Sequence, residues 1–505
     1  FAKVHSMGLL GVDGFLIQVE ADLSQGLPGF DVVGLPGAAV RESRDRVRAS
    51  LKNCGFDYPV SRITVNLAPA DVRKEGSVYD LPLLLALLKA SGQLTAGLED
   101  SAFLGELSLT GEIRPVRGVL PMVIAARDAG LRRVFIPAAN AAEGAVVEGV
   151  EVYPCGAVPE LLEHLAGRTP LPRAVPDPEG EGADAVPDFA DVMGQAAARR
   201  ALEVAAAGSH NILLIGPPGS GKSMLAKRLP SILPDMTPEE ALETTKIHSV
   251  AGVLPGGTGL LRSRPFRAPH HTISAMGMAG GGAPAPRPGE ISLAHNGVLF
   301  LDELPEFRRD ALEVLRQPLE DGVVQISRVA GTMRYPARFQ LVCAMNPCRC
   351  GWRGHPSGRC TCSDREVAKY VEKISGPLLD RIDLHVSVPS VDYASMRRRE
   401  TPESSADVKR RVDAARAIQT ARFAGTGVTC NAHMTAPMIG QFCRLDHAGD
   451  ALMKSAFERM GLTARSHDRI LRVARTIADL EGSPGIRVHH LAEAIQYRES
   501  GYLRR

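Results

Sequence analysis

One stretch restricts the fold more than any other, residues 211–223 with the sequence NILLIGPPGSGKS. A short apolar run of strand length is followed at once by the phosphate-loop pattern G-x-x-x-x-G-K-[ST], and an apolar helical segment comes next. Glycines let successive backbone N–H groups surround phosphate oxygens, and the following helix points its positive N-terminal end at them. A chance glycine turn between a strand and a helix would not require the strand, the glycine loop, the Lys-Ser pair and the apolar helix to follow one another at these positions. We therefore predict an α/β fold that binds a nucleotide.

The phosphate loop supplies most of the predicted nucleotide ligands. Lys222 would reach the β- and γ-phosphates, and the Ser223 hydroxyl would ligate Mg²⁺. The carboxylate of Asp302, later in the chain, would complete the site. The predicted nucleotide-binding residues are therefore Gly216, Pro217, Pro218, Gly219, Ser220, Gly221, Lys222, Ser223 and Asp302.

A second hydrophobic run, residues 297–301, ends in the carboxylates Asp302 and Glu303. A buried parallel strand delivers such residues to the carboxyl edge of its sheet, where ligands bind in open α/β folds. Asp302 would hold the metal through water, and Glu303 would orient and deprotonate the attacking water. An ordinary acidic turn would explain this run alone, but beside the phosphate loop it indicates an ATPase.

Three further residues have predicted roles in hydrolysis. Asn346 ends another buried strand and would position the attacking water, although it also suits a turn before Pro347. Arg381 would act as an arginine finger on a neighbouring subunit's γ-phosphate, and a salt bridge to a nearby aspartate is the alternative. Arg465 begins a helix with arginines at helical spacing and would sense nucleotide from a helical lid; the other arginines would form a solvated face or a DNA surface.

Two close cysteine pairs follow Asn346, namely Cys348 with Cys350 and Cys360 with Cys362. Four thiolates can surround Zn²⁺ tetrahedrally in a closed, structural site, and the alternative is a set of free loop thiols. His355 is a spare candidate ligand. The clustering favours a metal site in a reducing compartment over a disulfide framework, so we expect a cytoplasmic protein.

The length of 505 residues allows roughly three domains. Short strand-like and helical runs alternate in the first part, a segment rich in Pro, Gly and acids follows, and amphipathic helices end the chain. We predict an α/β domain at 1–168, a linker at 169–188, an ATPase core at 189–395 with a zinc insertion at 348–362, and a helical lid at 396–505.

Charge and hydropathy limit the partners. The net charge is only +2, but from residue 396 onward 19 Lys and Arg face 12 Asp and Glu. That surplus fits a surface for a polyanion, although a solvated helical surface would explain it as well. No apolar run reaches transmembrane length and the start of the chain has no secretory pattern, so we expect no membrane contact.

Two stretches of the first domain, residues 69–82 and 105–118, resemble the proteolytic domain of Lon, which has the ribosomal protein S5 domain 2-like fold. Lon-type proteases use a serine activated by a lysine. The serine position falls on Val78 and the lysine position on Leu120, so we expect a scaffold or DNA-contacting platform in place of a protease.

The motifs GPPGSGKS, GVLFLDELPEF, AMNPCRCG…CTC and SGPLLDRIDLHV resemble the magnesium-chelatase-like AAA+ family, and the whole chain resembles its YifB/ComM branch. The resemblance implies a hexameric, ATP-driven motor that moves along single-stranded or branched DNA and migrates strands during natural transformation. It also implies that Arg328 and Arg334, on a predicted β-hairpin, lie where this clade and the replicative MCM helicases place a pore hairpin. Arg349 departs from the expected proline.

Two other functions remain open. The ring could remodel a protein partner, as a chelatase-type protein does, with the first domain as an adaptor. The protein could also be a binding module without enzymatic activity, but the carboxylates Asp302 and Glu303 would then have to be catalytically inactive. The sequence leaves open the roles of the paired His270 and His271 and of the Gly-rich residues 276–289.

Overall fold

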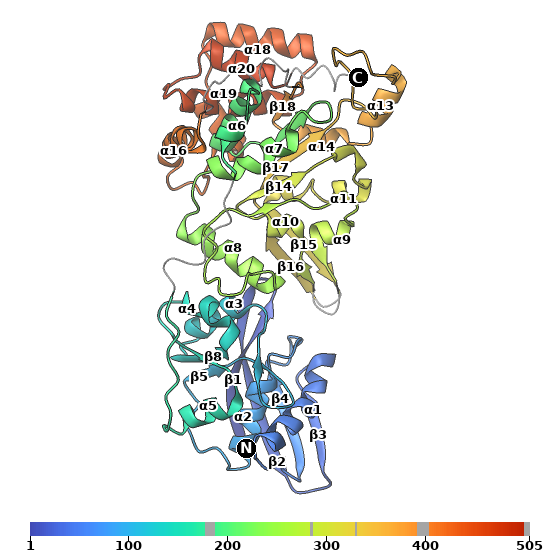
Figure 1. The fold of residues 1–505 in the computed structure, drawn as a ribbon. Helices are drawn as coiled ribbons and strands as arrows, with labels where there is room; N and C mark the ends of the chain where they lie inside the picture. Colours follow the sequence, from blue (N-terminus) through green and yellow to red (C-terminus); the bar gives the residue numbers. More distant parts are fainter. Residues whose placement is uncertain (177–186, 283–285, 329–330, 391–402, 499–505) are drawn as a thin grey trace.

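The computed structural model describes residues 1–176, 187–282, 286–328, 331–390 and 403–498. The molecule is elongated, with the N-terminal domain at one end, the parallel-sheet core in the middle and the C-terminal helices at the other end (Figure 1). Parts of the predicted linker (177–186) and of the predicted lid (396–402 and 499–505) lie outside the described residues.

The N-terminal domain is built on a mixed seven-stranded sheet in the order β3-β4-β2-β1-β5-β8-β9. Its strands are β1 (Ala2–Leu10), β2 (Asp13–Ser24), β3 (Gly29–Val33), β4 (Arg62–Ala68), β5 (Ser101–Phe103), β8 (Arg133–Pro137) and β9 (Glu151–Cys155), with a separate pair β6 (Glu106–Leu107) and β7 (Ile113–Arg114). Its helices are α1 (Ala38–Asn53), α2 (Asp80–Ala90), α3 (Val119–Asp128), α4 (Ala141–Ala145) and α5 (Val158–Leu165).

Helix α2 explains why this domain has its own core. Its residues from Asp80 to Leu88 are all buried, as expected for a helix that is apolar on every side. The two positions that would carry a Lon-type dyad, Val78 and Leu120, are buried and apolar. Nearby, the Ser77 hydroxyl donates to Glu106 and the Lys74 ammonium to the Pro69 carbonyl, so these two side chains do not pair.

The core contains a five-stranded, wholly parallel sheet in the order β11-β14-β17-β10-β18. Its strands are β10 (Ile212–Ile215), β11 (Phe266–Arg267), β14 (Val298–Leu301), β17 (Gln340–Met345) and β18 (Leu384–Ser387). Because all the strands run the same way, the residues that follow them share one carboxyl edge and those that precede them share one amino edge.

Helices and two small strand pairs surround this sheet. They are α6 (Ala196–Gly208), α7 (Lys222–Arg228), α8 (Pro238–Ala251), α9 (Ala275–Ala279), α10 (Glu290–Leu293), α11 (Arg309–Glu313), α12 (Pro318–Asp321), α13 (Asp364–Val371) and α14 (Gly376–Asp380), with β12 (Gly280–Gly281) paired to β13 (Arg287–Pro288) and β15 (Val323–Arg328) paired to β16 (Gly331–Pro336). A capping box between Thr237 and Glu240 fixes the start of α8.

Successive side chains of β10 pack in hydrophobic clusters on opposite faces of the sheet, because side chains alternate between the two faces of a strand. Ile212 and Leu214 pack with α6 and the C-terminal helices, whereas Leu213 and Ile215 pack with the hairpin side of the core. The C-terminal helices therefore share one hydrophobic core with the sheet. They are α16 (Ser405–Arg422), α17 (Ala436–Phe442), α18 (His447–Met460), α19 (Ala464–Leu480) and α20 (Val488–Gln496).

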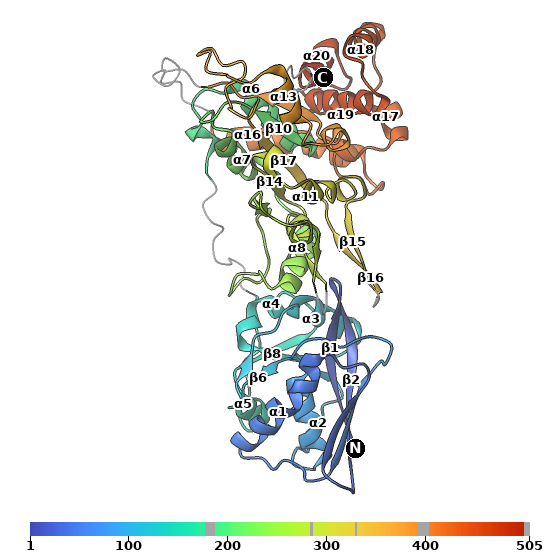
Figure 2. The ribbon, with the colours of Figure 1, turned by 90° about the vertical axis from the view of Figure 1, so that its right-hand side faces the viewer.

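The N-terminal domain docks on α8 and beside the β15–β16 hairpin, which descends toward the β1–β2 turn (Figure 2). Lys246 Nζ lies 2.8 Å from Asp13 Oδ1, and the Gly118 N–H donates to the Ser249 carbonyl at 3.1 Å. The Ser249 hydroxyl donates to Glu143 of α4. These contacts bind the two domains through one helix of the core.

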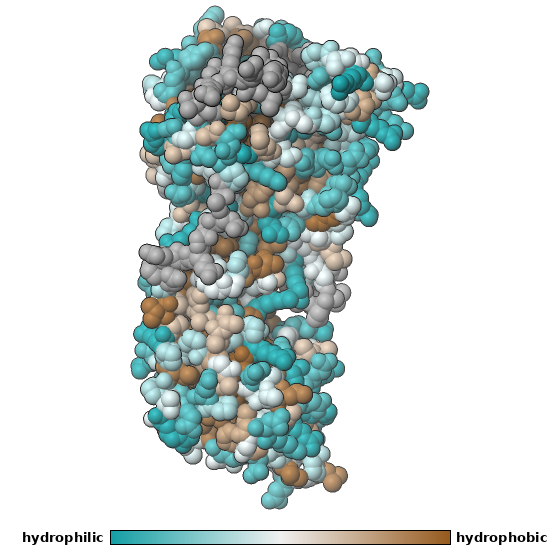
Figure 3. Space-filling view, viewed as in Figure 1, coloured by the Kyte–Doolittle hydropathy of each residue, from teal (hydrophilic) through white to brown (hydrophobic). Residues whose placement is uncertain are grey.

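Polar and apolar residues are mixed over the face shown in Figure 3. Among the described residues, no helix combines the length and apolar character that a membrane crossing would require.

Candidate nucleotide-binding and hydrolysis site

The phosphate loop connects β10 to α7 at the carboxyl edge of the sheet. Gly219 and Gly221 have φ of +75° and +88°, a region that L side chains rarely adopt. At Gly216, a Cβ would lie 2.1 Å from the Val388 carbonyl oxygen, so this position also requires glycine. The loop conformation therefore explains the glycines of the motif.

Lys222 lies at the centre of this loop. Its Nζ donates to the Gly216 and Pro217 carbonyls at 2.8 and 2.9 Å and to Asn346 Oδ1 at 3.2 Å. Burial lowers the pKa of the Lys222 ammonium, while Asp302 and Glu303 oppose that shift. A desolvated ammonium of this kind gains strongly from a phosphate oxygen as partner.

The Ser223 hydroxyl donates to Asp302 Oδ2 at 2.5 Å, so the two predicted magnesium-site residues meet across α7 and β14. A hydroxyl and a carboxylate are the hard oxygen ligands that Mg²⁺ uses, usually with several waters. The carboxyl edge thus brings Lys222, Ser223, Asp302 and Asn346 together.

Glu303 lies beside this group and has a second neighbour. Its φ is +53°, and its side chain is 58% exposed. Oε2 lies 3.5 Å from Nδ1 of His271, a residue whose role the sequence left open. His271 follows β11, the neighbour of β14, so strand order and not a local motif brings it to Glu303.

Arg381 and Arg465 lie at the opposite, amino edge. Asn211, which precedes β10, donates through Nδ2 to the Arg381 carbonyl at 2.9 Å. The phosphate loop begins after β10, and a four-residue strand spans roughly 13 Å at about 3.3 Å per residue. The amino-edge arginines are therefore separated from the chain's own phosphate loop by the depth of the sheet.

The amino edge carries a cavity of about 490 Å³. Its basic lining consists of Arg338, Arg381, Arg465, Arg469 and Arg472. Arg381 is only 8% exposed and pairs with Glu320, rather than with the neighbouring aspartates that the sequence offered as alternatives. Asp383 pairs instead with Arg469 at 3.3 Å.

Three guanidinium atoms around this cavity are buried and have no hydrogen-bond acceptor within the described ranges: Arg381 Nε, Arg469 Nη1 and Arg472 Nε. A buried donor without an acceptor costs free energy, and the cost is larger for a charged group. These three N–H donors are open to an anionic acceptor, although the carboxylates Glu320, Asp321, Asp383 and Asp468 also line the cavity.

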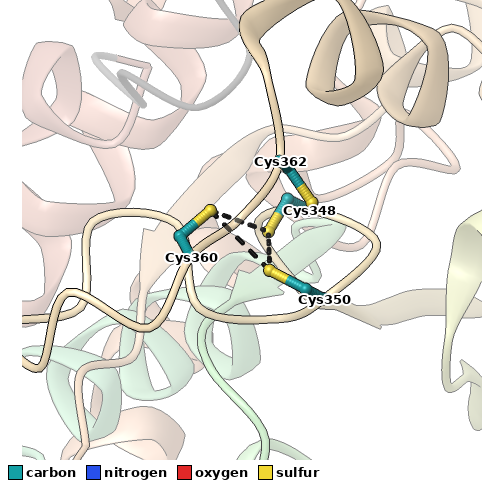
Figure 4. Close-up of side chains that lie close together, drawn as sticks. All are labelled: Cys348, Cys350, Cys360 and Cys362. Atoms are coloured by element: carbon teal, nitrogen blue, oxygen red, sulfur yellow. Dashed lines mark hydrogen bonds between the residues drawn. The ribbon is translucent and has the colours of Figure 1, made fainter.

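The four cysteines gather directly after Asn346 (Figure 4). Cys348 Sγ lies 3.3 Å from Cys350 and 3.8 Å from Cys360, and Cys350 lies 3.7 Å from Cys360. A tetrahedral zinc with Zn–S bonds of about 2.3 Å would set the sulfurs about 3.8 Å apart. The arrangement fits zinc.

Two neighbours of the cluster define its boundary. His355, the spare candidate ligand, is bonded to Ser357 at 2.7 Å and to Ser390 at 3.1 Å, so it lies outside the group of sulfurs. At Gly351, a Cβ would lie 2.7 Å from ring carbons of Pro218, so the cysteine segment packs closely against the phosphate loop.

The predicted hairpin forms, with Arg334 opposite Gln325 and Arg328 opposite Gly331 in the backbone register. Arg334 is exposed and lines a second cavity of about 370 Å³ together with Val12 and Asp13 of the N-terminal domain. The side chain of Arg328 lies outside the described residues.

Three family models match the chain: subunit ChlI of magnesium chelatase at residues 19–140, the main magnesium chelatase subunit ChlI model at residues 188–396, and its C-terminal model at residues 402–498. The chain belongs to the magnesium-chelatase-like family of AAA+ ATPases. The predicted α/β fold, with its N-terminal domain, nucleotide-binding core and C-terminal helices, is thereby confirmed.

Two relatives assign the chain to the YifB/ComM branch of this family. The YifB protein of Escherichia coli K12 is 45% identical over 498 residues, covering 98% of this chain and 96% of the relative. The competence protein ComM of Haemophilus influenzae is 44% identical over 504 residues, covering 98% and 97%. A Lon protease of Mycolicibacterium smegmatis is 29% identical over 168 residues, 31% of this chain and 21% of the protease.

Proposed function

We propose that the protein is one subunit of a ring, a hexamer, that hydrolyses ATP between neighbouring subunits and moves along DNA. The observation that carries this proposal is the division of the predicted catalytic residues between the two edges of one sheet. A site that needs both sets can form only where the carboxyl edge of one subunit meets the amino edge of the next.

At the carboxyl edge, each residue has a proposed role. Lys222 binds the β- and γ-phosphates, Ser223 and Asp302 hold Mg²⁺, and Asn346 positions the attacking water. Glu303 takes the proton from that water. The contacts among Lys222, Asn346, Ser223 and Asp302 support these roles.

At the amino edge, Arg381 reaches the γ-phosphate of the neighbouring subunit and stabilises the charge that develops there during transfer. Arg465 adds a second cation from the start of α19. The buried donors of the same cavity that lack acceptors support an anionic ligand at this edge.

The four cysteines hold a structural zinc in this proposal. Zinc here would fix the segment that follows Asn346. That segment packs on Pro218 of the phosphate loop. The fit of the sulfur separations to tetrahedral coordination supports zinc as the metal.

DNA is the polymer along which the proposed ring moves. One relative is a competence protein, and the C-terminal part carries a surplus of basic residues. Arg334, and Arg328 beyond it on the hairpin, would contact the DNA backbone, whose phosphates give sequence-independent and salt-sensitive binding. We extend the proposal to helicase or branch-migration activity during natural transformation.

The deciding experiment measures ATPase and strand displacement on forked and Holliday-type DNA, with the Glu303→Gln variant as the inactive control. The Arg328→Ala, Arg334→Ala double variant should retain ATP hydrolysis and lose strand movement. Arg309→Ala, which removes an exposed arginine at the start of α11, is the matched control.

Undiminished strand displacement by the double variant would contradict the role given to the hairpin. ATPase activity that DNA does not stimulate, together with no binding to forked DNA, would support remodelling of a protein partner instead.

A further inference from the structure

Arg381, the proposed finger, is held by a carboxylate from a distant part of the chain. The Arg381 guanidinium forms an ion pair through Nη2 with Glu320, and its Nη1 donates to the Pro377 carbonyl at 2.8 Å. Asp383, two residues after Arg381, is instead paired with Arg469 at 3.3 Å. Within the described ranges, Glu320 is therefore the carboxylate that holds the Arg381 side chain.

This pairing orients the guanidinium without using all its donors. A guanidinium carries five N–H donors in a fixed plane. The contacts with Glu320 and Pro377 engage Nη2 and Nη1, while Arg381 Nε is buried and has no acceptor among the described residues. The guanidinium can therefore receive a phosphate oxygen and keep Glu320 as a partner.

Glu320 lies next to the base of the β15–β16 hairpin. It belongs to the short helix α12, whose cap Gly322 donates its N–H to the Pro318 carbonyl at 2.9 Å. β15 begins at the next residue, and the end of β16 returns to the same point, because the Ala337 N–H donates to the Gly322 carbonyl at 2.8 Å. Leu319 of α12 packs in the hydrophobic cluster that contains side chains of both hairpin strands. A shift of Glu320 would therefore be passed to the hairpin.

We propose that Glu320 is a positioning residue that directs Arg381 toward the nucleotide of the neighbouring subunit and connects that arginine to the base of the β15–β16 hairpin. The first part rests on the proposed ATP hydrolysis between subunits, and the second on the proposed movement along DNA. When Arg381 binds the neighbour's γ-phosphate, the pull on Glu320 shifts α12 and with it the hairpin. Loss of the γ-phosphate reverses the shift.

The first measurement is kcat and KM for ATP in Glu320→Ala, Glu320→Gln and the control Glu313→Ala. Glu320→Ala should lower kcat by roughly tenfold, the effect of one charge-assisted hydrogen bond. KM for ATP should not change, because Glu320 contacts the arginine and not the chain's own phosphate loop. Glu320→Gln keeps an acceptor oxygen and should recover part of the loss. Glu313 forms a partly exposed ion pair with Arg316 at 2.6 Å, so its removal should leave kcat unchanged.

Mixed rings distinguish a positioning role from a structural one. Glu320→Ala should impair the amino edge of its subunit and leave the carboxyl edge intact, whereas Glu303→Gln should do the reverse. A mixture of the two variants should therefore regain activity at the interfaces that combine both intact edges. A general structural defect in the Glu320→Ala subunit would not be corrected by this mixture.

The connection to the hairpin is tested by the affinity for single-stranded DNA, measured with a slowly hydrolysed ATP analogue and with ADP. If the γ-phosphate moves the hairpin through Glu320, the two affinities should differ in the wild type, because coupling between two ligands is reciprocal. Glu320→Ala should reduce that difference and retain DNA binding.

An unchanged or higher kcat in Glu320→Ala rings that bind ATP would overturn the positioning role, and Glu320→Ser replaces this variant if it is unstable. Equal DNA affinities with the two nucleotides in the wild type, or a difference that persists in the variant, would overturn the connection to the hairpin. A wild type that binds no DNA would refute the motor function, and kcat would still decide the role of Glu320. A wild type that sediments as a monomer while it hydrolyses ATP would refute the proposed ring itself.

Discussion

The two edges of the core sheet differ in how their charged groups are satisfied. At the carboxyl edge, Lys222 already has three oxygen acceptors and Ser223 already meets Asp302. At the amino edge, guanidinium donors of Arg381, Arg469 and Arg472 are buried without acceptors in the part of the chain that is described. At the first edge the polar side chains bond to one another, whereas the second edge keeps three N–H donors without acceptors, even though Arg381 pairs with Glu320 and Arg469 with Asp383.

The difference between the two edges supports the proposed ring. Both edges belong to the same rigid sheet, so no side-chain rotation brings Arg381 to the chain's own phosphate loop. A neighbouring subunit can supply it.

Loss of the loop lysine should have the largest effect. Lys222→Ala removes the cation at the centre of the phosphate loop, and we expect no measurable ATP binding by titration with a fluorescent analogue. The control is Lys227→Ala, an exposed lysine on the same helix. Binding by the Lys222 variant at the wild-type affinity would show that the carboxyl edge is not the nucleotide site.

Arg381→Ala should spare ATP binding and reduce kcat by roughly a factor of 10³ or more, as for other arginine fingers. Mixing this variant with Glu303→Gln subunits should restore part of the activity, because each variant supplies the edge that the other lacks. Failure of the mixture to regain activity, with both variants assembled into rings, would mean that the edges do not cooperate across subunits.

Arg465→Ala should have a smaller effect than Arg381→Ala. Its side chain is exposed, and one charge-assisted hydrogen bond corresponds to roughly a tenfold or somewhat larger change in rate. The measurement is kcat at saturating ATP, and Lys454→Ala, at an exposed position of the preceding helix, is the comparison variant. Equal losses for Arg465 and Arg381 would assign both residues to the same step.

Removal of the metal should have the smallest effect of these changes, and that effect should be confined to the carboxyl edge. Cys360→Ser should abolish zinc in elemental analysis and raise KM for ATP several-fold, because the cysteine segment supports Pro218 of the phosphate loop. Cys54→Ser, in the N-terminal domain, is the control. A preparation that contains no zinc before mutation would refute the metal assignment.

Local motifs carried most of the sequence predictions for the carboxyl edge. The phosphate loop, the two carboxylates and Asn346 each follow a buried strand, and strand polarity alone places such residues at one edge. The helical end was harder to interpret. The sequence predicts that Arg465 senses nucleotide, but which subunit's nucleotide it would reach depends on how α19 packs against the amino edge.

The sequence by itself determined the phosphate-loop motif, the carboxylates after β14, the cysteine pairs and the family, because each motif depends on residues close together in the chain. Only the tertiary structure decided that β11 borders β14, so that His271 meets Glu303, and that five arginines line one cavity. It also decided that the N-terminal domain docks through α8 beside the hairpin. Strand order and docking depend on packing between distant segments, which a motif does not specify.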